Sequence, residues 1–410
     1  MKKIFLLAVL CLAGGMAFAQ KKNVSRANNE LKQEKPNYEE ARQLVKEARE
    51  NPETQNEART WWVSAEVEDA IFLQNDQKRV TNQSYDDAAM YKALEDEYKF
   101  LQQALYLDSL PNAKGKVSPK YSKKIIQRIH DRHMSFWDAA VISYKNQDYK
   151  KAYEMWNTYL IIPEKYGISE EKKKQLEESG KVDSTYIFGR YYAALAAYIS
   201  KDYELAIPAL NRAKESDYDV LTIYQCLNEL YTNQKDSANM FAISQEAVER
   251  MGINKDTENF LLQMINIYIA QDQINDAIAY LDKAIAANPR PEYYKVKGRL
   301  YEEVANEAEA MACFEKALEL NPNMADVWSE MGRIYYNKAY EESQEINKIK
   351  DDKEYLKARE ERIFPLYRKA LPYYEKAYSI DPTNADCVFA LKGIYYTLGM
   401  EDKLKSLEGK

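Results

Sequence analysis

The sequence predicts an all-α protein built of stacked helix pairs, and three observations support this fold class. Glycine and proline are scarce, with 12 of each among 410 residues, so few positions interrupt a helix. No stretch shows the sustained polar–apolar alternation that predicts strands. An order of small, large, small and proline residues recurs after 33 residues, first at Ala277, Leu281, Ala284 and Pro289 and then at Ala310, Phe314, Ala317 and Pro322. A fixed interval of this kind indicates a repeat architecture.

The clearest repeat unit begins at Pro291 and carries a small residue in each of its two predicted helices. Gly298 and Ala310 let the helices approach closely, because larger side chains would hold the two backbones apart. Phe314 is one of the large residues that fill the space between the layers. Pro322 ends the second helix, since proline lacks a backbone N–H and disfavours helix in the residue before it.

This unit resembles the 34-residue tetratricopeptide repeat. Counted from Pro291, Gly298 stands at the eighth place, Ala310 at the twentieth, Ala317 at the twenty-seventh and Pro322 at the thirty-second. The resemblance covers most of residues 38–408 and is strongest from about residue 258. It implies a right-handed superhelical solenoid of tetratricopeptide helix pairs, with several lengthened helices or insertions, whose concave groove binds other proteins.

The repeats differ in length. Pro322 and Pro382 are 60 residues apart, so 26 residues are inserted relative to a 34-residue repeat. The inserted residues are rich in both acidic and basic side chains, which favours a protruding, salt-bridged helical hairpin. We therefore expect divergent tetratricopeptide-like repeats with insertions over 38–181, and a tetratricopeptide array over 182–410 with an inserted helical hairpin around 340–366 and a C-terminal cap.

The first residues have the order of a secretory signal peptide. Two lysines precede an uncharged apolar stretch from Ile4 to Leu12, and an Ala-x-Ala cleavage motif occupies residues 17–19. The apolar stretch is shorter than the roughly 20 residues that span a bilayer. We predict a signal peptide at 1–19, a mobile segment at 20–37, and a periplasmic or secreted protein without a transmembrane segment.

A lipoprotein anchored through Cys11 is the alternative for this end of the chain. The residue before an acylated cysteine should be small, whereas Leu10 is large. A signal peptide cleaved after Ala19 is therefore the favoured interpretation.

Composition and motifs argue against several functions. The net charge of −7 provides no basic face for nucleic acid. Cys226, Cys313 and Cys387 fall in apolar helical patterns and should be buried thiols. His130 and His133 share a helix face but have no further ligands at a recognisable spacing. No phosphate-binding glycine loop or hydrolase motif occurs. We expect no metal, no cofactor and no catalysis.

The resemblance also suggests where partners bind. In tetratricopeptide repeats, first-helix residues at the second, fifth, ninth, twelfth and thirteenth places line the concave groove. Lys295, Arg299 and Arg333 would then form a basic spot suited to a carboxylate. The candidate partner-binding residues are Tyr191, Gln225, Asn233, Asn266, Lys295, Arg299, Arg333, Tyr336 and Asn337.

The sequence thus predicts a non-catalytic periplasmic scaffold or adaptor that binds envelope proteins or peptides. Two alternatives stay open: a glycan or cell-wall binding protein that uses groove tyrosines, and an accessory subunit of an envelope enzyme complex. The identity of the partner and the oligomeric state are not encoded in these patterns.

Overall fold

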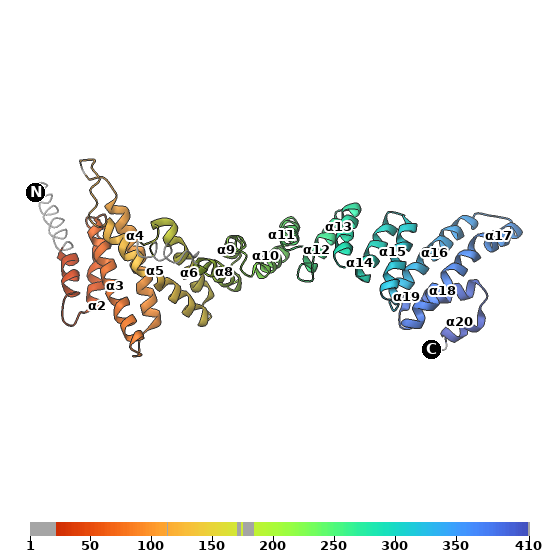
Figure 1. Ribbon diagram of the computed structural model, residues 1–410, viewed down its shortest axis with the longest axis horizontal. Coiled ribbons are helices and arrows are strands. Elements are labelled where there is room, and N and C mark those ends of the chain that lie inside the picture. Colours follow the sequence, from red (N-terminus) through yellow and green to blue (C-terminus); the bar gives the residue numbers. More distant parts are fainter. Residues whose placement is uncertain (1–21, 113, 170–173, 175–183, 409–410) are drawn as a thin grey trace, which may run out of the picture. The chain divides into compact units, whose positions relative to one another are not determined.

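Helices and short connections make up the part of the chain that the computed structural model describes, which is residues 22–112, 114–169, 174 and 184–408 (Figure 1). No strand occurs among these residues, so the predicted all-α fold is confirmed. The chain divides into two compact units, Met1–Leu230 and Tyr231–Lys410. None of the described helices is both long enough and apolar enough to cross a membrane.

The first unit contains most of the lengthened helices. Its elements are α2 (Tyr38–Glu50), α3 (Ala58–Val80), α4 (Asp87–Asp108), α5 (Ser122–Lys145), α6 (Tyr149–Tyr166), α8 (Ser184–Ile199), α9 (Tyr203–Ala213) and the first part of α10 (Val220–Gln234). Helices α3, α4 and α5 have 23, 22 and 24 residues, well beyond the mean of about 11 to 12 in globular proteins. The extra sequence between the N-terminal repeats is therefore built largely into longer helices.

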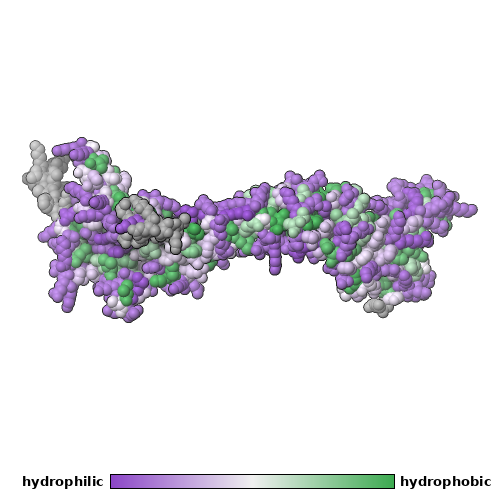
Figure 2. Space-filling model, in the orientation of Figure 1, coloured by the Kyte–Doolittle hydropathy of each residue, from purple (hydrophilic) through white to green (hydrophobic). Residues whose placement is uncertain are grey.

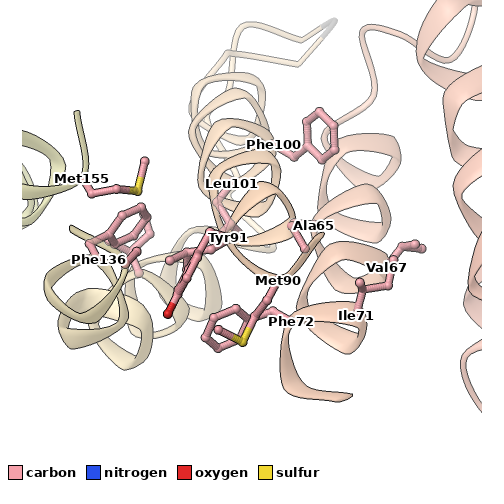
Figure 3. Packing of buried hydrophobic residues seen from close by; sticks show 14 of the residues in the cluster. Ala65, Val67, Ile71, Phe72, Met90, Tyr91, Phe100, Leu101, Phe136 and Met155 are labelled. Carbon is pink, nitrogen blue, oxygen red and sulfur yellow. The ribbon is translucent and has the colours of Figure 1, made fainter. Parts of the chain in front are cut away.

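The core of the first unit lies where successive helices pack against one another. Figure 3 shows Tyr91 of α4, Phe136 of α5 and Met155 of α6 meeting in this layer, all of them buried. Phe136 also makes an edge contact with the ring of Tyr98, with the ring centroids 5.4 Å apart. Large side chains thus fill the space between helices, as the repeat pattern requires.

The segment expected to be mobile is partly helical. Residues 22–30 form helical turns, and the side chains of Val24 and Ala27 are buried in the same core as α2 and α3. Their burial differs from the expectation of mobility for 20–37. The predicted signal peptide at 1–19 lies outside the described residues.

The second unit begins in the last residues of α10 and continues with shorter helices. Its further elements are α11 (Ser237–Met251), α12 (Glu258–Ala270), α13 (Ile274–Ala287), α14 (Pro291–Glu303), α15 (Glu307–Leu320), α16 (Ala325–Ile346), α17 (Asp352–Ala358), η1 (Arg359–Ile363), α18 (Phe364–Ile380), α19 (Ala385–Thr397) and α20 (Glu401–Glu408). Helices α14 and α15 pair with each other, as do α16 and α18.

Several of the tight turns within helix pairs share one local design. A residue with positive φ ends the first helix, and the next residue caps the second: Ala305 has φ 55°, and the Asn306 side chain accepts a hydrogen bond from the Glu309 amide at 3.4 Å. Lys201 and Asp202 repeat the arrangement between α8 and α9. Asparagine and aspartate suit the capping place because their side-chain oxygens satisfy free amides of the first turn.

The inserted residues extend α16 and form α17 and η1 ahead of α18. In η1, the Phe364 amide donates to the Arg359 carbonyl five residues earlier, which makes this turn a π-helix. Pro365 follows and has no N–H to donate to Glu361, so the regular bonding pattern is interrupted there. Ala339, Ile346 and Ile363 form a small apolar cluster at the base of the insertion. Figure 2 shows mainly hydrophilic residues over the α17 end.

Candidate partner-binding face

Close contacts between glycines and aromatic rings bring the helices of the second unit together. A Cβ built on Gly298 of α14 would lie 2.5 Å from Cε1 of Phe314 on α15. A Cβ on Gly332 of α16 would lie 2.8 Å from Cδ2 of Tyr374 on α18. The small and large residues of the repeat therefore meet as the sequence predicts, and they set the position of each first helix.

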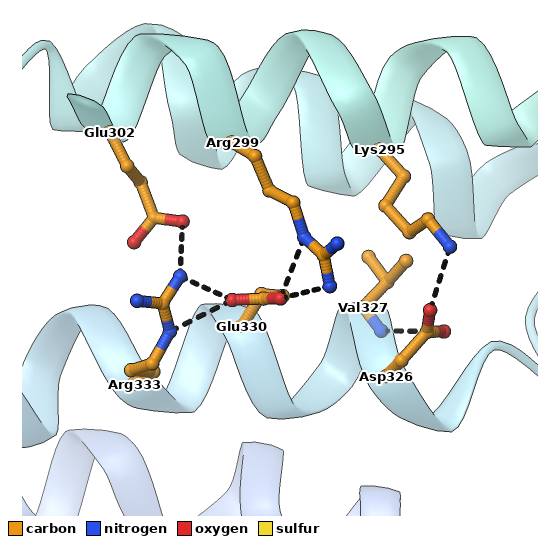
Figure 4. A network of polar contacts seen from close by, with 7 residues as sticks. All are labelled: Lys295, Arg299, Glu302, Asp326, Val327, Glu330 and Arg333. Atoms are coloured by element: carbon orange, nitrogen blue, oxygen red, sulfur yellow. Dashed lines mark hydrogen bonds and ion pairs between the residues drawn. The ribbon is translucent and has the colours of Figure 1, made fainter. Parts of the chain in front are cut away.

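The predicted basic spot is an ion-pair ladder between α14 and α16 (Figure 4). Arg299 Nε donates to Glu330 Oε1 at 2.8 Å, and Lys295 Nζ donates to Asp326 Oδ2 at 2.9 Å. Arg333 Nε donates to the other oxygen of Glu330 at 2.8 Å, and its Nη2 donates to Glu302 at 2.9 Å. Each of the three predicted cations already has a carboxylate partner. The face is cross-linked and locally neutralised, and it is not an uncompensated basic spot.

Burial affects the acids of this ladder. Desolvation raises the pKa of Glu302 to about 6, while the charge of Arg333 opposes the shift and Glu330 adds to it. The carboxylate of Glu330 lies between two guanidinium groups and is largely buried, with 12% of its side chain exposed. The ion pairs of the ladder therefore serve first to join α14 to α16, the first helices of two successive repeats.

The remaining predicted residues fall into two groups. Gln225, Asn233, Asn266 and Asn337 are exposed polar side chains. Tyr191 is buried, and its hydroxyl donates to Asp219 Oδ2 at 2.5 Å. Tyr336 is half-buried, with its ring 5.3 Å from that of Tyr367 and 6.2 Å from that of Tyr374.

Two exposed aromatic residues on α19 were not among the predicted residues. Phe389 is 73% exposed and Tyr396 is 77% exposed. Counted from Ala385, which follows Pro382 as Ala325 follows Pro322, they stand at the fifth and twelfth places. The same groove rule would have selected both residues. The expectation of a C-terminal cap does not take these two exposed rings into account.

A buried cluster of charges in the first unit was also missed. Arg128 Nη1 of α5 lies 2.6 Å from Asp69 Oδ2 of α3 and 3.3 Å from Glu97 Oε1 of α4. Arg132 contacts the same two carboxylates, with its Nε 3.4 Å from Glu97 Oε2. Burial, together with the nearby Asp69, raises the pKa of Glu97 to about 8, against the opposing effect of both arginines. The cluster joins three helices, and both carboxylates are engaged by arginines.

The two histidines bind backbone carbonyls of the following segment. His133 Nε2 lies 2.8 Å from the Tyr159 carbonyl oxygen, and His130 Nε2 lies 3.0 Å from that of Gly167. The amide that would ordinarily bond the Tyr159 carbonyl belongs to Pro163, which has no N–H. Among the described residues, no group of three or more potential metal ligands is assembled.

Comparison with known proteins identifies the repeat. A family model described as tetratricopeptide repeat matches residues 266–291 and 291–324. No curated protein sequence matches the chain. The chain is similar to the crystal structure of MamA, with 19% identity, 46% of this chain and 88% of that chain covered, and a TM-score of 0.34.

Two further solved structures are similar at the same level. YrrB, a tetratricopeptide protein with an unusual peptide-binding site, is 14% identical over 49% of this chain and 93% of its own, with a TM-score of 0.30. PilW, a type IV pilus biogenesis factor, is 16% identical over 54% of this chain and 90% of its own, with a TM-score of 0.33. Scores below 0.5 do not establish a shared overall architecture.

The repeat assignment therefore rests on the matched segments and on the helix pairs that contain them. The matched segment includes α13, α14 and α15, where Gly298 and Phe314 make the close contact expected of the repeat. Repeats of this kind form a protein-interaction fold, because stacked helix pairs present an extended surface. The chain thus contains tetratricopeptide repeats, matched at residues 266–324.

Proposed function

We propose that this protein is an exported, non-catalytic scaffold that binds a partner protein of the cell envelope through the first-helix face of its second unit. The partner segment is an extended peptide with at least one apolar or aromatic side chain. The proposal rests on Phe389 and Tyr396 of α19, because both aromatic rings are exposed to solvent although the helix that carries them is packed against the core.

The geometry of α19 places the rings of Phe389 and Tyr396 on the same side of the helix. They lie seven residues apart, which is nearly two helical turns and a separation of about 10.5 Å along the axis. On the opposite side of the same helix, Cys387, Leu391 and Ile394 are buried against the core. The helix is therefore anchored by one side, and the two exposed rings are available to a partner.

Charge on the other first helices of the second unit favours a partner of low charge. Lys295, Arg299 and Arg333 are held by acidic side chains, so an acidic peptide would have to displace an existing partner. Asn266 and Asn337 are exposed and supply uncharged hydrogen-bonding groups on α12 and α16. This surface is therefore best suited to a peptide that makes apolar contacts through its side chains and hydrogen bonds through its main chain.

Export is proposed from the N-terminal sequence. Lys2 and Lys3, the apolar stretch after them and the Ala-x-Ala motif at residues 17–19 support it. Cell fractionation followed by mass measurement of the mature chain tests it. A periplasmic protein that begins at Gln20 supports export, whereas an unprocessed cytosolic chain contradicts it.

Site-specific photo-crosslinking in intact cells tests the binding surface. A photoreactive phenylalanine analogue placed at Phe389 or at Tyr396 should each give the same discrete protein adduct. The analogue at Tyr106, which is also exposed but lies on α4 in the first unit, should not give that adduct. Identical adducts from all three positions, or none from the two on α19, would refute the proposed surface.

The two alternatives can be separated from this proposal. The glycan hypothesis relied on groove tyrosines, but Tyr191 is buried and Tyr336 packs against other rings. Binding of cell-wall polysaccharide that is lost in Tyr396→Ala, without any protein adduct, would favour it. Hydrolase activity in a reconstituted envelope complex that requires this chain would favour an accessory enzyme subunit.

A further inference from the structure

A small recess in the first unit is surrounded by hydrogen-bond donors from three helices. Tyr153 and Asn157 of α6, Arg190 of α8 and Arg212 of α9 line it, together with apolar side chains that include Leu160 and Pro208. Its volume is about 140 Å³. A water molecule takes about 30 Å³ of liquid volume, so the recess has room for a few waters or for one small ionic group.

One of these donors is buried without an acceptor. Arg190 Nε is shielded from solvent and has no hydrogen-bond partner among the described residues. Buried donors in native proteins are normally paired, and a guanidinium group has five N–H bonds and no acceptor. An acceptor atom supplied from outside the chain would remove this deficit.

The other polar groups around the recess are also able to donate. Burial raises the pKa of the Tyr153 hydroxyl, against the opposing effect of Arg212, so the phenol stays protonated at neutral pH. The Asn157 amide offers two N–H bonds, and Arg212 adds a second guanidinium group. Several donors that include one unpaired N–H favour an anion in this recess, since each oxygen of an oxyanion accepts several hydrogen bonds.

Two glutamates that do not line the recess pair with its two arginines. Arg190 Nη1 lies 3.4 Å from Glu215 Oε2, and Arg212 Nη2 pairs with Glu164. The side chains of Glu164 and Glu215 are 56% and 66% exposed. Exposed ion pairs are weak and screened by salt, so an anion that enters the recess can displace these carboxylates.

We propose that this recess between α6, α8 and α9 binds one small oxyanion, the carboxylate or phosphate group of a ligand, with Arg190 and Arg212 as its principal donors. Guanidinium groups suit either anion because their paired N–H bonds match two oxygens of a carboxylate or a phosphate. The site belongs to the first unit and is separate from the aromatic surface on α19, so it stands whether or not the proposed peptide surface is correct.

Calorimetric titration of the purified full chain with sodium phosphate and with sodium acetate tests the site at constant ionic strength. At least one anion should give saturable binding, and Arg190→Gln and Arg212→Gln should each weaken it at least tenfold. Arg26→Gln is the matched control, because Arg26 also pairs with an exposed glutamate, Glu40. Binding of phosphate alone or of acetate alone identifies which of the two groups the site takes.

The glutamates that pair with Arg190 and Arg212 provide a second test that does not depend on a core substitution. Glu164→Gln and Glu215→Gln remove the competing carboxylates and should tighten binding several-fold. Glu40→Gln makes the same change in net charge at the surface and should leave binding unchanged. The absence of saturable binding by either anion means that the recess holds only water and overturns the proposal, as do equal effects in the control variants.

Discussion

The ring of Phe314 on α15 packs so closely over Gly298 on α14 that no side chain fits between them. A Cβ at this position would be 2.5 Å from the ring. We predict that Gly298→Ala lowers the free energy of unfolding by about 1 to 3 kcal/mol, because overpacking outweighs the roughly 1 kcal/mol that alanine adds to helix propensity. Chemical denaturation measures the change.

A compensating substitution identifies the cause of this loss. Phe314→Leu removes the ring and should make the additional Gly298→Ala change far less costly than it is in the unchanged protein. A double-mutant cycle gives the coupling between the two positions. If the cost of Gly298→Ala is independent of the residue at 314, the contact does not set the helix spacing.

A second prediction compares the helix interface with the insertion. Ala317 of α15 is fully buried, whereas Lys353 of α17 is exposed. Ala317→Leu should cost roughly 1 to 3 kcal/mol through overpacking, and Lys353→Ala should change stability little. Thermal melts of the two variants measure this, and equal shifts in Tm would argue against the assigned repeat.

The stability of the first unit should fall as pH rises towards 8. The pKa of Glu97 is raised from 4.5 to about 8, so the folded state binds its proton more tightly than the unfolded state does. Unfolding then releases protons, and stability declines between these two values. Burial also raises the pKa of Glu66 in the same unit, so a matched variant is needed to isolate the contribution of Glu97.

The Glu97→Gln variant tests this assignment. It keeps the size of the side chain and removes the titrating group, so its unfolding temperature should vary less with pH between 6 and 8. Glu53→Gln, at an exposed position, should retain the slope of the unchanged protein. A Glu97→Gln variant with the full slope would show that another group is responsible.

The bond from His133 to the Tyr159 carbonyl should matter because of Pro163. His133→Phe keeps a ring for the stack on Tyr159, whose centroid lies 4.3 Å away, but removes the donor. We expect a loss of about 0.5 to 1.5 kcal/mol. In a Pro163→Ala background the helix can supply its own amide, so the same substitution should cost less. Equal costs in the two backgrounds would contradict this role.

Local spacing was sufficient to predict the helix interfaces. Gly298 and Phe314 are 16 residues apart, and their contact follows from a small and a large residue at fixed places on two adjoining helices. Pro322 marks the end of α15, which stops at Leu320. Such features depend on one helix pair at a time, and a single repeat carries the information.

Contacts between distant side chains could not be read in this way. The pairing of Arg132 with Asp69 spans 63 residues, and the sequence contains 58 basic and 65 acidic side chains from which partners might be chosen. The prediction of a basic spot misses the same kind of contact. The groove rule locates Arg299 and Arg333, but it does not show that Glu330 lies between them. The place of Tyr191 in its helix predicts a groove position, but it does not reveal that the Tyr191 hydroxyl bonds to Asp219.

The ladder between α14 and α16 also depends on a fixed number of residues between its partners. Lys295 and Asp326, Arg299 and Glu330, and Glu302 and Arg333 are each separated by 31 residues. One residue gained or lost within α14 or α16 would turn part of that helix by about 100° and misalign several pairs at once. Changes in length should therefore be tolerated only outside this register, as the long insertion after residue 340 is.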